Sequence, residues 1–257
     1  MSDTPDLGVA ICAHNSQRTI GQTIRSVEGL ARRVIVVDSG STDDTIEVCR
    51  SLGAQVIQRG WAGHVAQKQF SIDQCRQHKW ILLLDSDESA EPALRDSIRG
   101  VMQMDDPAYD GWSLNRKIWF MGGWLHYTYQ PEWRLRLFRS GKGRVAGRDP
   151  HDRIDVDGRI GKLKGDLRHD PWTDMTDMAM RHLRYAQIAC TQTTRGGSLL
   201  NILFNPPAAI VKQLVLKRGL LDGWRGVVIA GMTANSILLK HAFIAAHKRS
   251  TREDSSS

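Results

Sequence analysis

The chain has 257 residues, 41% hydrophobic and 25% charged, which is enough to bury one substantial core. Its four cysteines, at positions 12, 49, 75 and 190, form no CxxC pair, which argues against a disulfide scaffold or a zinc site and fits a reducing compartment. The formal net charge is +7, and segment 195–249 holds eight basic residues against one acidic residue. This basic, apolar segment indicates an anionic partner surface, either membrane or nucleic acid.

The first hundred residues alternate strand and helix patterns. Short apolar or β-branched runs predict strands, and the segments between them have helical spacing, as at Ile20, Ile24 and Val27. This order predicts an α/β fold of the Rossmann-like kind, with a mostly parallel sheet flanked by helices. The predicted strands are 7–13, 33–38, 54–58 and 80–85, and the predicted helices are 16–30, 41–53, 63–77 and 91–104.

Polar residues follow each of these predicted strands. Ligands of parallel sheets bind at the carboxyl ends of the strands, so we expect the functional chemistry at that edge. The strand ends are Ala13-His14-Asn15, Asp38-Ser39-Gly40, Gln58-Arg59 and Asp85-Ser86-Asp87.

The pattern changes after Tyr109. Segments 111–120 and 132–141 predict antiparallel strands, and 177–190 predicts an amphipathic helix. Beyond residue 190, Lys and Arg punctuate apolar helices, and the longest uncharged part of the last helix is the fourteen residues 226–239. A bilayer span needs about 20 residues, so we expect this segment not to cross a membrane unaided. We predict one domain over 1–190, with halves near 1–105 and 106–190, and a basic amphipathic helical region with a disordered tail over 191–257.

Asp85 and Asp87 leave a buried strand two positions apart. Both carboxylates can reach one divalent cation, whose remaining positions are filled by water and phosphate oxygens. The alternative is a solvated turn with acidic residues at a helix start. Asp38 ends another strand, where a carboxylate can accept hydrogen bonds from a base or a ribose, or can belong to a capped loop.

Taken together, these segments resemble a known family. AICAHNSQRTI, VIVVDSGSTDDT, WAGHVAQKQ and ILLLDSDE have the order and spacing of a family 2 glycosyltransferase with the GT-A fold. The closer resemblance is to the subgroup with lipopolysaccharide-core β-1,4-glucosyltransferases, and it covers about residues 7 to 190. The subgroup motifs are Trp61, Gly63 and Gln67-Lys68, then Arg136-Leu137-Phe138-Arg139, then His151-Asp152.

The resemblance implies a nucleotide-sugar donor, expected to be a UDP-sugar, across the strand ends. It assigns uracil and ribose to Ala13, His14, Asn15, Asp38 and Gly40. It assigns ribose and a bridging Mg²⁺ or Mn²⁺ to Asp85 and Asp87, with Ser86 also binding the donor and Lys68 adding positive charge. The chain departs from the family at His14 and Ser16, where Tyr and Glu are common, and uracil stacks less well on His than on Tyr.

The same resemblance implies an inverting transfer, in which a carboxylate takes the proton of the attacking hydroxyl. We assign this role to Asp152, where the family usually has Glu. A surface acid paired with Arg148 or Arg153 is the alternative. His169 occupies the place of a late histidine that often completes the metal shell in GT-A enzymes, and His151 competes with it. A structural or surface role remains the alternative for His169.

Two arginines alternate on one predicted strand. Arg134 and Arg136 share a face, where they can contact a phosphorylated acceptor or the donor diphosphate, together with His151. A solvated strand face is the alternative.

We therefore expect an inverting, metal-dependent glycosyltransferase of lipopolysaccharide or cell-envelope synthesis, peripheral on the cytoplasmic face of a membrane. Its expected partners are a nucleotide sugar, a lipid-linked saccharide and an anionic membrane surface, with a possible homodimer and no nucleic acid. The alternative is a non-catalytic protein that binds nucleotide sugars or an anionic surface. A nucleotidyltransferase or a dehydrogenase would need a Gly-rich phosphate loop, which AHNSQRTIG lacks. The segment MSDTPDLG has no basic or apolar region, so we expect no secretory signal.

Overall fold

The computed structural model describes residues 5–149, 151–192 and 196–254, and the side chains of all of these except residues 151, 191, 192 and 250–254. The chain forms two compact units: unit 1 comprises Met1–Lys117 and Pro131–Asp170, and unit 2 comprises Ile118–Gln130 and Pro171–Ser257. These units divide the chain at other places than the expected boundary after residue 190, because helix α5 (Met175–Gln192) packs on helix α7 (Trp224–Asp254). The predicted division into functional regions, 1–105, 106–190 and 191–257, stays a prediction.

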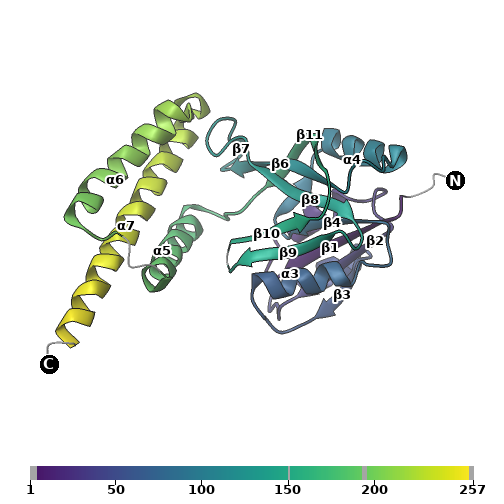
Figure 1. Ribbon diagram of the computed structural model, residues 1–257, viewed down its shortest axis with the longest axis horizontal. Coiled ribbons are helices and arrows are strands. Elements are labelled where there is room, and N and C mark those ends of the chain that lie inside the picture. The colour runs from purple at the N-terminus through teal and green to yellow at the C-terminus, as the bar shows by residue number, and fades with distance from the viewer. Residues whose placement is uncertain (1–4, 150, 193–195, 255–257) are drawn as a thin grey trace. The chain divides into compact units, whose positions relative to one another are not determined.

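Unit 1 is built on a sheet with strand order β3-β2-β1-β4-β8-β6-β11-β5 (Figure 1). Its first part is parallel and consists of β1 (Leu7–Ala13), β2 (Arg33–Asp38), β3 (Gln55–Gln58) and β4 (Trp80–Asp85). The second part adds antiparallel pairs, formed by β8 (Trp133–Arg139) with β4 and β6 (Gly111–Phe120), and by β11 (Ile160–His169) with β5 (Glu88–Ala90). The predicted α/β class is confirmed.

Four helices and a β-ribbon flank this sheet. The helices are α1 (Ile20–Arg25), α2 (Thr45–Ser51), α3 (His64–Asp73) and α4 (Pro92–Met104), and the ribbon pairs β9 (Gly143–Arg148) with β10 (His151–Val156). Helix α1 is shorter than the predicted 16–30. Asn15 and Gly29 adopt positive φ angles of 47° and 69° at its two flanks, and such angles are incompatible with continued right-handed helix.

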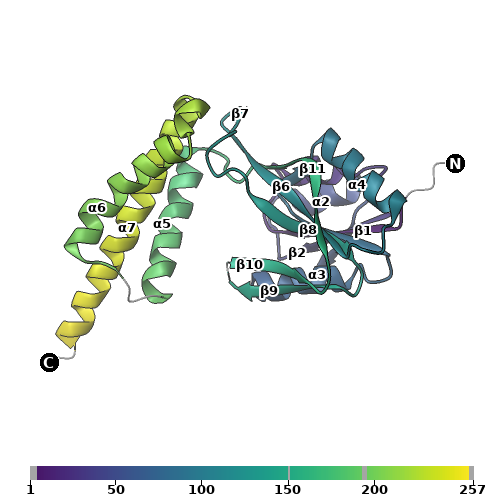
Figure 2. The same ribbon diagram turned by 45° about the horizontal axis from the view of Figure 1, so that its top comes forward.

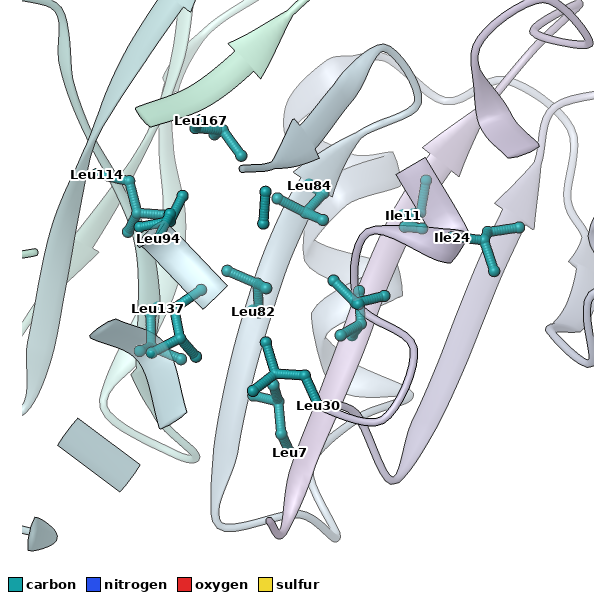
Figure 3. Close-up of a cluster of buried hydrophobic side chains, with 14 of the residues drawn as sticks. Leu7, Ile11, Ile24, Leu30, Leu82, Leu84, Leu94, Leu114, Leu137 and Leu167 are labelled. Atoms are coloured by element: carbon teal, nitrogen blue, oxygen red, sulfur yellow. The ribbon is translucent and has the colours of Figure 1, made fainter. Parts of the chain in front are cut away.

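The core lies on both faces of the sheet, because successive side chains of a strand point to opposite sides. One face joins β1 and β4 to α1 and α4 through Leu7, Ile11, Ile24, Leu82, Leu84 and Leu94 (Figure 3). On the other face, Ala10, Ile81 and Leu83 pack against Ile72 of α3 and against the ribbon residues Val145 and Ile154. This two-sided burial explains the uninterrupted apolar run before Asp85.

Unit 2 consists of helices and a short hairpin. After α5 come α6 (Leu199–Val211), a π-helical turn (Lys212–Leu216), a 3-10 turn (Gly219–Asp222) and α7. Helix α7 lies between α5 and α6 (Figures 1 and 2). The end of β6 pairs with β7 (Gly123–Trp124), and a small core joins Phe120, Leu125, Met178 and Ile229.

Two stretches of unit 2 have the length and composition of membrane spans, Leu199–Leu216 and Trp224–Arg249. The second finding differs from the expectation drawn from the fourteen uncharged residues 226–239, because a span tolerates a few charged residues. Core helices of soluble proteins also meet this criterion, so the finding alone is weak support for crossing.

Candidate active site

The carboxyl ends of three strands meet at one edge of the sheet in unit 1. In the strand register, Ala13 of β1 is the partner of Asp38 of β2, and Cys12 of β1 is the partner of Asp85 of β4. The predicted strand ends are therefore brought together as expected for a parallel sheet.

Basic side chains of the protein lie among the acids that follow β4. Lys68 Nζ of α3 is 2.7 Å from Asp85 Oδ1, and Arg136 of β8 donates to Asp85 Oδ2 at 2.6 Å. The same guanidinium donates to Glu88 Oε1 at 2.6 Å, and Arg116 of β6 lies 3.4 Å from that oxygen. Glu88 is fully buried. From the sequence, we predicted that a divalent metal ion supplies the positive charge near these acids. In the structure, Lys68, Arg136 and Arg116 supply part of it.

These ion pairs outweigh the cost of burial. Burial alone would raise the pKa of Asp85, but Arg136 and Lys68 hold it well below its ordinary value. Burial alone would lower the pKa of Lys68, but Asp85 and Asp152 raise it. The pKa of Arg136 is raised in the same way by Asp85 and Glu88, against the effect of burial. Asp85, Lys68 and Arg136 are therefore all charged at neutral pH.

Lys68 also connects the end of β4 to the ribbon. Its Nζ donates to Oδ2 of Asp152 in β10 at 2.8 Å, and the side chain of Asp152 is only 11% exposed. Of the two surface partners considered for Asp152, Arg153 instead pairs with Asp155 at 2.8 Å. One ammonium group therefore bridges the predicted metal-site and base carboxylates, which are 67 positions apart in the sequence.

Asp87 and His169 form a second pair beside this cluster. His169 ends β11, where it is the register partner of Glu88, and its Nε2 lies 3.6 Å from Asp87 Oδ2. Burial alone would raise the pKa of Asp87, but the neighbouring His169 lowers it. His169 Nδ1 is buried and has no hydrogen-bond partner among the described residues. The structure thus brings together the acid and the histidine that the resemblance assigned to a metal.

The loop after β2 uses its predicted ligand-binding acid internally. Asp38 is fully buried, its Oδ1 accepts from the N–H groups of Gly40 and Ser41 at 2.9 Å, and its Oδ2 accepts from the Ser41 hydroxyl. Asn15 Oδ1 accepts from the Thr42 N–H at 2.8 Å and joins the loops that follow β1 and β2. Both oxygens of Asp38 therefore organise the loop, which agrees with the capped-loop alternative.

The remaining predicted residues have different surroundings. His14 is exposed, and the Ser86 hydroxyl lies 2.8 Å from that of Ser16. Arg134 pairs with Glu132 at 2.6 Å and has a 42% exposed side chain, whereas Arg136 is buried beneath the acids. His151 begins β10, and its side chain lies outside the described residues.

Sequence reasoning missed the buried part of this network. Glu88 was interpreted as an acid near a helix start, and Arg116 was not considered as a candidate. Arg116 binds Glu132 through Nε at 3.0 Å and Nη2 at 2.6 Å, and thereby joins β6 to the start of β8. A charged residue within an apolar strand was the available signal, because such a residue is rarely buried without a partner.

Similarity to known sequences identifies the protein family. The sequence profile described as Glycosyl transferase family 2 matches residues 8–156, more than half of the chain. This chain belongs to glycosyl transferase family 2. The match spans β1 to β10, including Asp38, Lys68, Asp85 and Asp152. The predicted family and the predicted enzyme class, a glycosyltransferase, are confirmed.

Individual relatives agree with this placement. The chain is 29% identical over 262 residues to the lipopolysaccharide core biosynthesis glycosyltransferase LpsC of Rhizobium meliloti (strain 1021), with 93% of this chain and 94% of that protein covered. It is 42% identical over 202 residues to the uncharacterized glycosyltransferase RP128 of Rickettsia prowazekii (strain Madrid E), with 74% and 69% covered. The first relationship supports the predicted resemblance to lipopolysaccharide-core enzymes.

Similarity to solved structures is weaker. Glucosyl-3-phosphoglycerate synthase from Mycobacterium tuberculosis, in complex with Mn²⁺ and UDP-glucose, is 25% identical, covers 46% of this chain and 45% of its own, and has a TM-score of 0.36. A TM-score this low supports no inference about the ligands of this chain.

Proposed function

We propose that this family 2 glycosyltransferase moves a sugar, with inversion, from a UDP-sugar to a hydroxyl of a lipid-linked cell-envelope saccharide, with the help of Mg²⁺ or Mn²⁺. The observation that carries the proposal is the Lys68 bridge between Asp85 and Asp152 at the carboxyl ends of the strands. It places a candidate base close to the edge where a parallel sheet binds its ligand.

The donor would lie across the loops that follow β1 and β2. Asn15 and Asp38 fix the backbone of these loops through hydrogen bonds to Thr42, Gly40 and Ser41. In this proposal Asp38 contributes by holding the loop in shape, and His14 is exposed and available to a base. Lys68 adds positive charge that favours the diphosphate.

A metal fits best between Asp87 and His169. A carboxylate and an imidazole whose facing atoms, Asp87 Oδ2 and His169 Nε2, are 3.6 Å apart are ligands that Mn²⁺ accepts. No cluster of three or more His, Cys, Asp or Glu ligands occurs in the described part of the chain. Two protein ligands with phosphate oxygens and water is a usual arrangement for hard divalent ions. Asp85 would join them by exchanging its contact with Lys68 or Arg136. Such an ion would act as a Lewis acid on the leaving diphosphate.

Asp152 would be the general base. Its Oδ2 accepts from Lys68, which orients the carboxylate and leaves Oδ1 for the acceptor hydroxyl. The hydroxyl oxygen forms the new bond to the anomeric carbon as the bond from that carbon to the diphosphate breaks, and the hydroxyl proton passes to Asp152. Attack from the face opposite the diphosphate inverts the anomeric configuration.

Two observations support the proposed membrane-borne acceptor. The chain is similar to LpsC over nearly its full length, and unit 2 exposes large apolar side chains such as Leu200 and Phe204. Both favour an acceptor carried in a membrane, and a peripheral location on its cytoplasmic face.

The decisive experiment pairs Asp152→Asn with Asp155→Asn on the same strand. The purified chain is screened against a panel of nucleotide sugars, with Mn²⁺ or with chelator, for sugar transfer and for donor hydrolysis. Asp152→Asn should lower turnover by about 10²–10⁴-fold while the affinity for UDP remains, and Asp155→Asn should leave turnover unchanged. Full turnover by Asp152→Asn would refute its role as base. Donor binding without turnover by the wild type would favour the non-catalytic alternative.

A further inference from the structure

Helix α6 and the turn after it present a continuous apolar surface. Only 6% of the stretch 199–216 is buried. Seven of its apolar side chains are more than half exposed, and all of them except Leu216 share one side of the helix. We call this surface the α6 face, formed by Leu199, Leu200, Leu203, Phe204, Val211 and Val215. An exposed apolar patch of this kind marks an interaction surface.

Basic residues border the α6 face at both ends, because Lys248 of α7 donates to the Gly196 carbonyl just before α6. The sequence has no charged residue from Gly196 to Val211, and then Lys212, Lys217 and Arg218 follow, all exposed. Trp224 is 55% exposed beyond them. Apolar side chains flanked by Lys, Arg and Trp suit the boundary between acyl chains and anionic headgroups. A second copy of the chain would instead bring the same basic residues together, and like charges repel.

The packing inside unit 2 fixes the direction of its helices. The start of α6 lies against the distal half of α7, where the Gly197 N–H donates to His241 Nδ1 at 3.3 Å and Asn205 Nδ2 lies 2.9 Å from His241 Nε2. After α6, Gly219 lies against Gly226 at the beginning of α7. Helices α6 and α7 therefore form an antiparallel hairpin.

Helix α5 runs in the same direction as α7. Trp172, just before α5, packs edge-to-face on Phe120 with ring centroids 5.7 Å apart, and Met178 shares a core with Ile229 near the start of α7. A hairpin of α6 and α7 that crossed a bilayer would therefore carry α5 to the same depth.

The outer side of α5 carries charged and polar side chains beside the exposed Met180 and Tyr185. Arg181, Arg184 and Gln187 are exposed there, and Arg181 pairs with Asp177 along the helix. Charged side chains facing lipid at the centre of a bilayer are strongly unfavourable. The unit thus has an apolar side on α6 and a side with charged residues on α5, with α7 between them.

We infer that unit 2 docks on an anionic membrane with the α6 face inserted into one leaflet, so that α6 lies parallel to the membrane plane and α5 faces water. The inference deepens the proposed action on a membrane-borne acceptor, on which it rests for its biological purpose, but docking can be measured without catalysis. Lys212, Lys217 and Arg218 would contact the anionic headgroups.

The first test uses flotation with vesicles of phosphatidylglycerol and phosphatidylethanolamine, compared with phosphatidylcholine alone. The full chain should float with the anionic vesicles, and L203Q/F204Q should lower the partition coefficient at least tenfold. The matched control is M180Q/Y185Q on α5, whose side chains are 54% and 51% exposed against 55% and 61% for Leu203 and Phe204. The control should float as the wild type does. All four side chains are exposed, so thermal unfolding of both variants should match that of the wild type.

The second test distinguishes in-plane docking from crossing. Arg249→Cys places a thiol at the distal end of α7, in a Cys190→Ser background. Burial raises the pKa of Cys12 and Cys49 to about 11 and that of Cys75 to about 12, so these thiols react poorly. With protein added outside intact vesicles, a membrane-impermeant maleimide should label this thiol fully before detergent is added.

Three results would overturn the inference. They are flotation of L203Q/F204Q equal to that of the wild type, protection of Arg249→Cys until detergent is added, and a lipid-free dimer that L203Q/F204Q dissociates. Asp152→Asn separates this inference from the proposed function, because it should float normally. An active enzyme that fails to float would refute docking alone.

Discussion

Replacement of Arg136 by Met tests the idea that buried basic side chains hold the acids of the site together. Arg136 is 5% exposed, and its guanidinium donates to Asp85 and Glu88 at 2.6 Å each. Met fills a similar volume without charge or donors. The variant would leave Glu88, which is fully buried, with Arg116 as its remaining guanidinium contact at 3.4 Å.

Removal of one partner from a buried ion pair costs about 3–5 kcal/mol, because the other charge stays buried without compensation. Lys68 and Arg116 remain, so we expect the lower end, about 3 kcal/mol of unfolding free energy. For a unit of this size that corresponds to a fall in Tm of about 6–12 °C. The matched control is Arg134→Met on the same strand face. Its side chain is 42% exposed, so it should cost at most about 1 kcal/mol.

The loss should depend on pH. The folded-state pKa of Asp85 lies well below its ordinary value, so its ion pairs stabilise the fold above about pH 4 and cease to do so as the pH falls through the folded value. The difference in Tm between wild type and Arg136→Met should therefore be full at pH 7 and shrink below about pH 4. Scanning calorimetry at both pH values measures it. Glu88→Gln added to Arg136→Met should recover part of the loss. Equal effects of Arg136→Met and Arg134→Met would refute the reasoning.

Two further predictions concern a glycine of β11 and the proposed metal site. Gly165→Ala should cost about 3 kcal/mol or more, because at φ +90° its Cβ would lie 2.3 Å from the backbone nitrogen of Leu94, whereas Gly141→Ala, at φ +79° with nothing within 4 Å, should cost about 1 kcal/mol. Equal losses of Tm would contradict this. His169→Ala should weaken Mn²⁺-dependent stabilisation by UDP about tenfold in a thermal-shift titration, since it removes a proposed ligand of the ion. An unchanged Mn²⁺ midpoint would exclude His169 from the site.

The strands of unit 1 were predictable because burial on both faces leaves a direct signal. The runs at 7–13, 33–38 and 80–85 match β1, β2 and β4 residue for residue. The end of helix α1 was harder to predict. The apolar spacing continues to Leu30, whereas Gly29 already turns the chain toward β2. Periodicity shows which side of a segment is buried, but local φ angles decide where a helix ends.

At the site, the acids could be found from the sequence but their partners could not. Asp85 and Asp87 follow a recognisable strand. Arg136 is 51 positions from Asp85, and Lys68 is 84 positions from Asp152. No local pattern relates such residues, because they meet only when α3, β8 and β10 pack around β4. Asp38 shows in addition that a carboxylate at a strand end can serve its own loop.

The packing partner of helix α5 could not be read from the sequence. Helix α5 was correctly predicted as amphipathic, but its pattern does not say that its apolar side packs on α7. The hairpin of residues 118–130 lies between two strands of the sheet and yet shares a core with α5 and α7 through Phe120 and Leu125.

The hydrogen bonds of Asp222 limit which segments can be exchanged between this chain and its relatives. Asp222 accepts from the N–H groups of His126, Tyr127 and Thr128, so the turn before α7 is fastened to a loop that interrupts the sheet sequence. A chimera that swapped only residues 171–257 would join a foreign turn to the native loop and leave Phe120 and Leu125 against an unmatched core. A folded chimera must therefore exchange residues 118–130 together with residues 171–257, so that both segments come from the same relative.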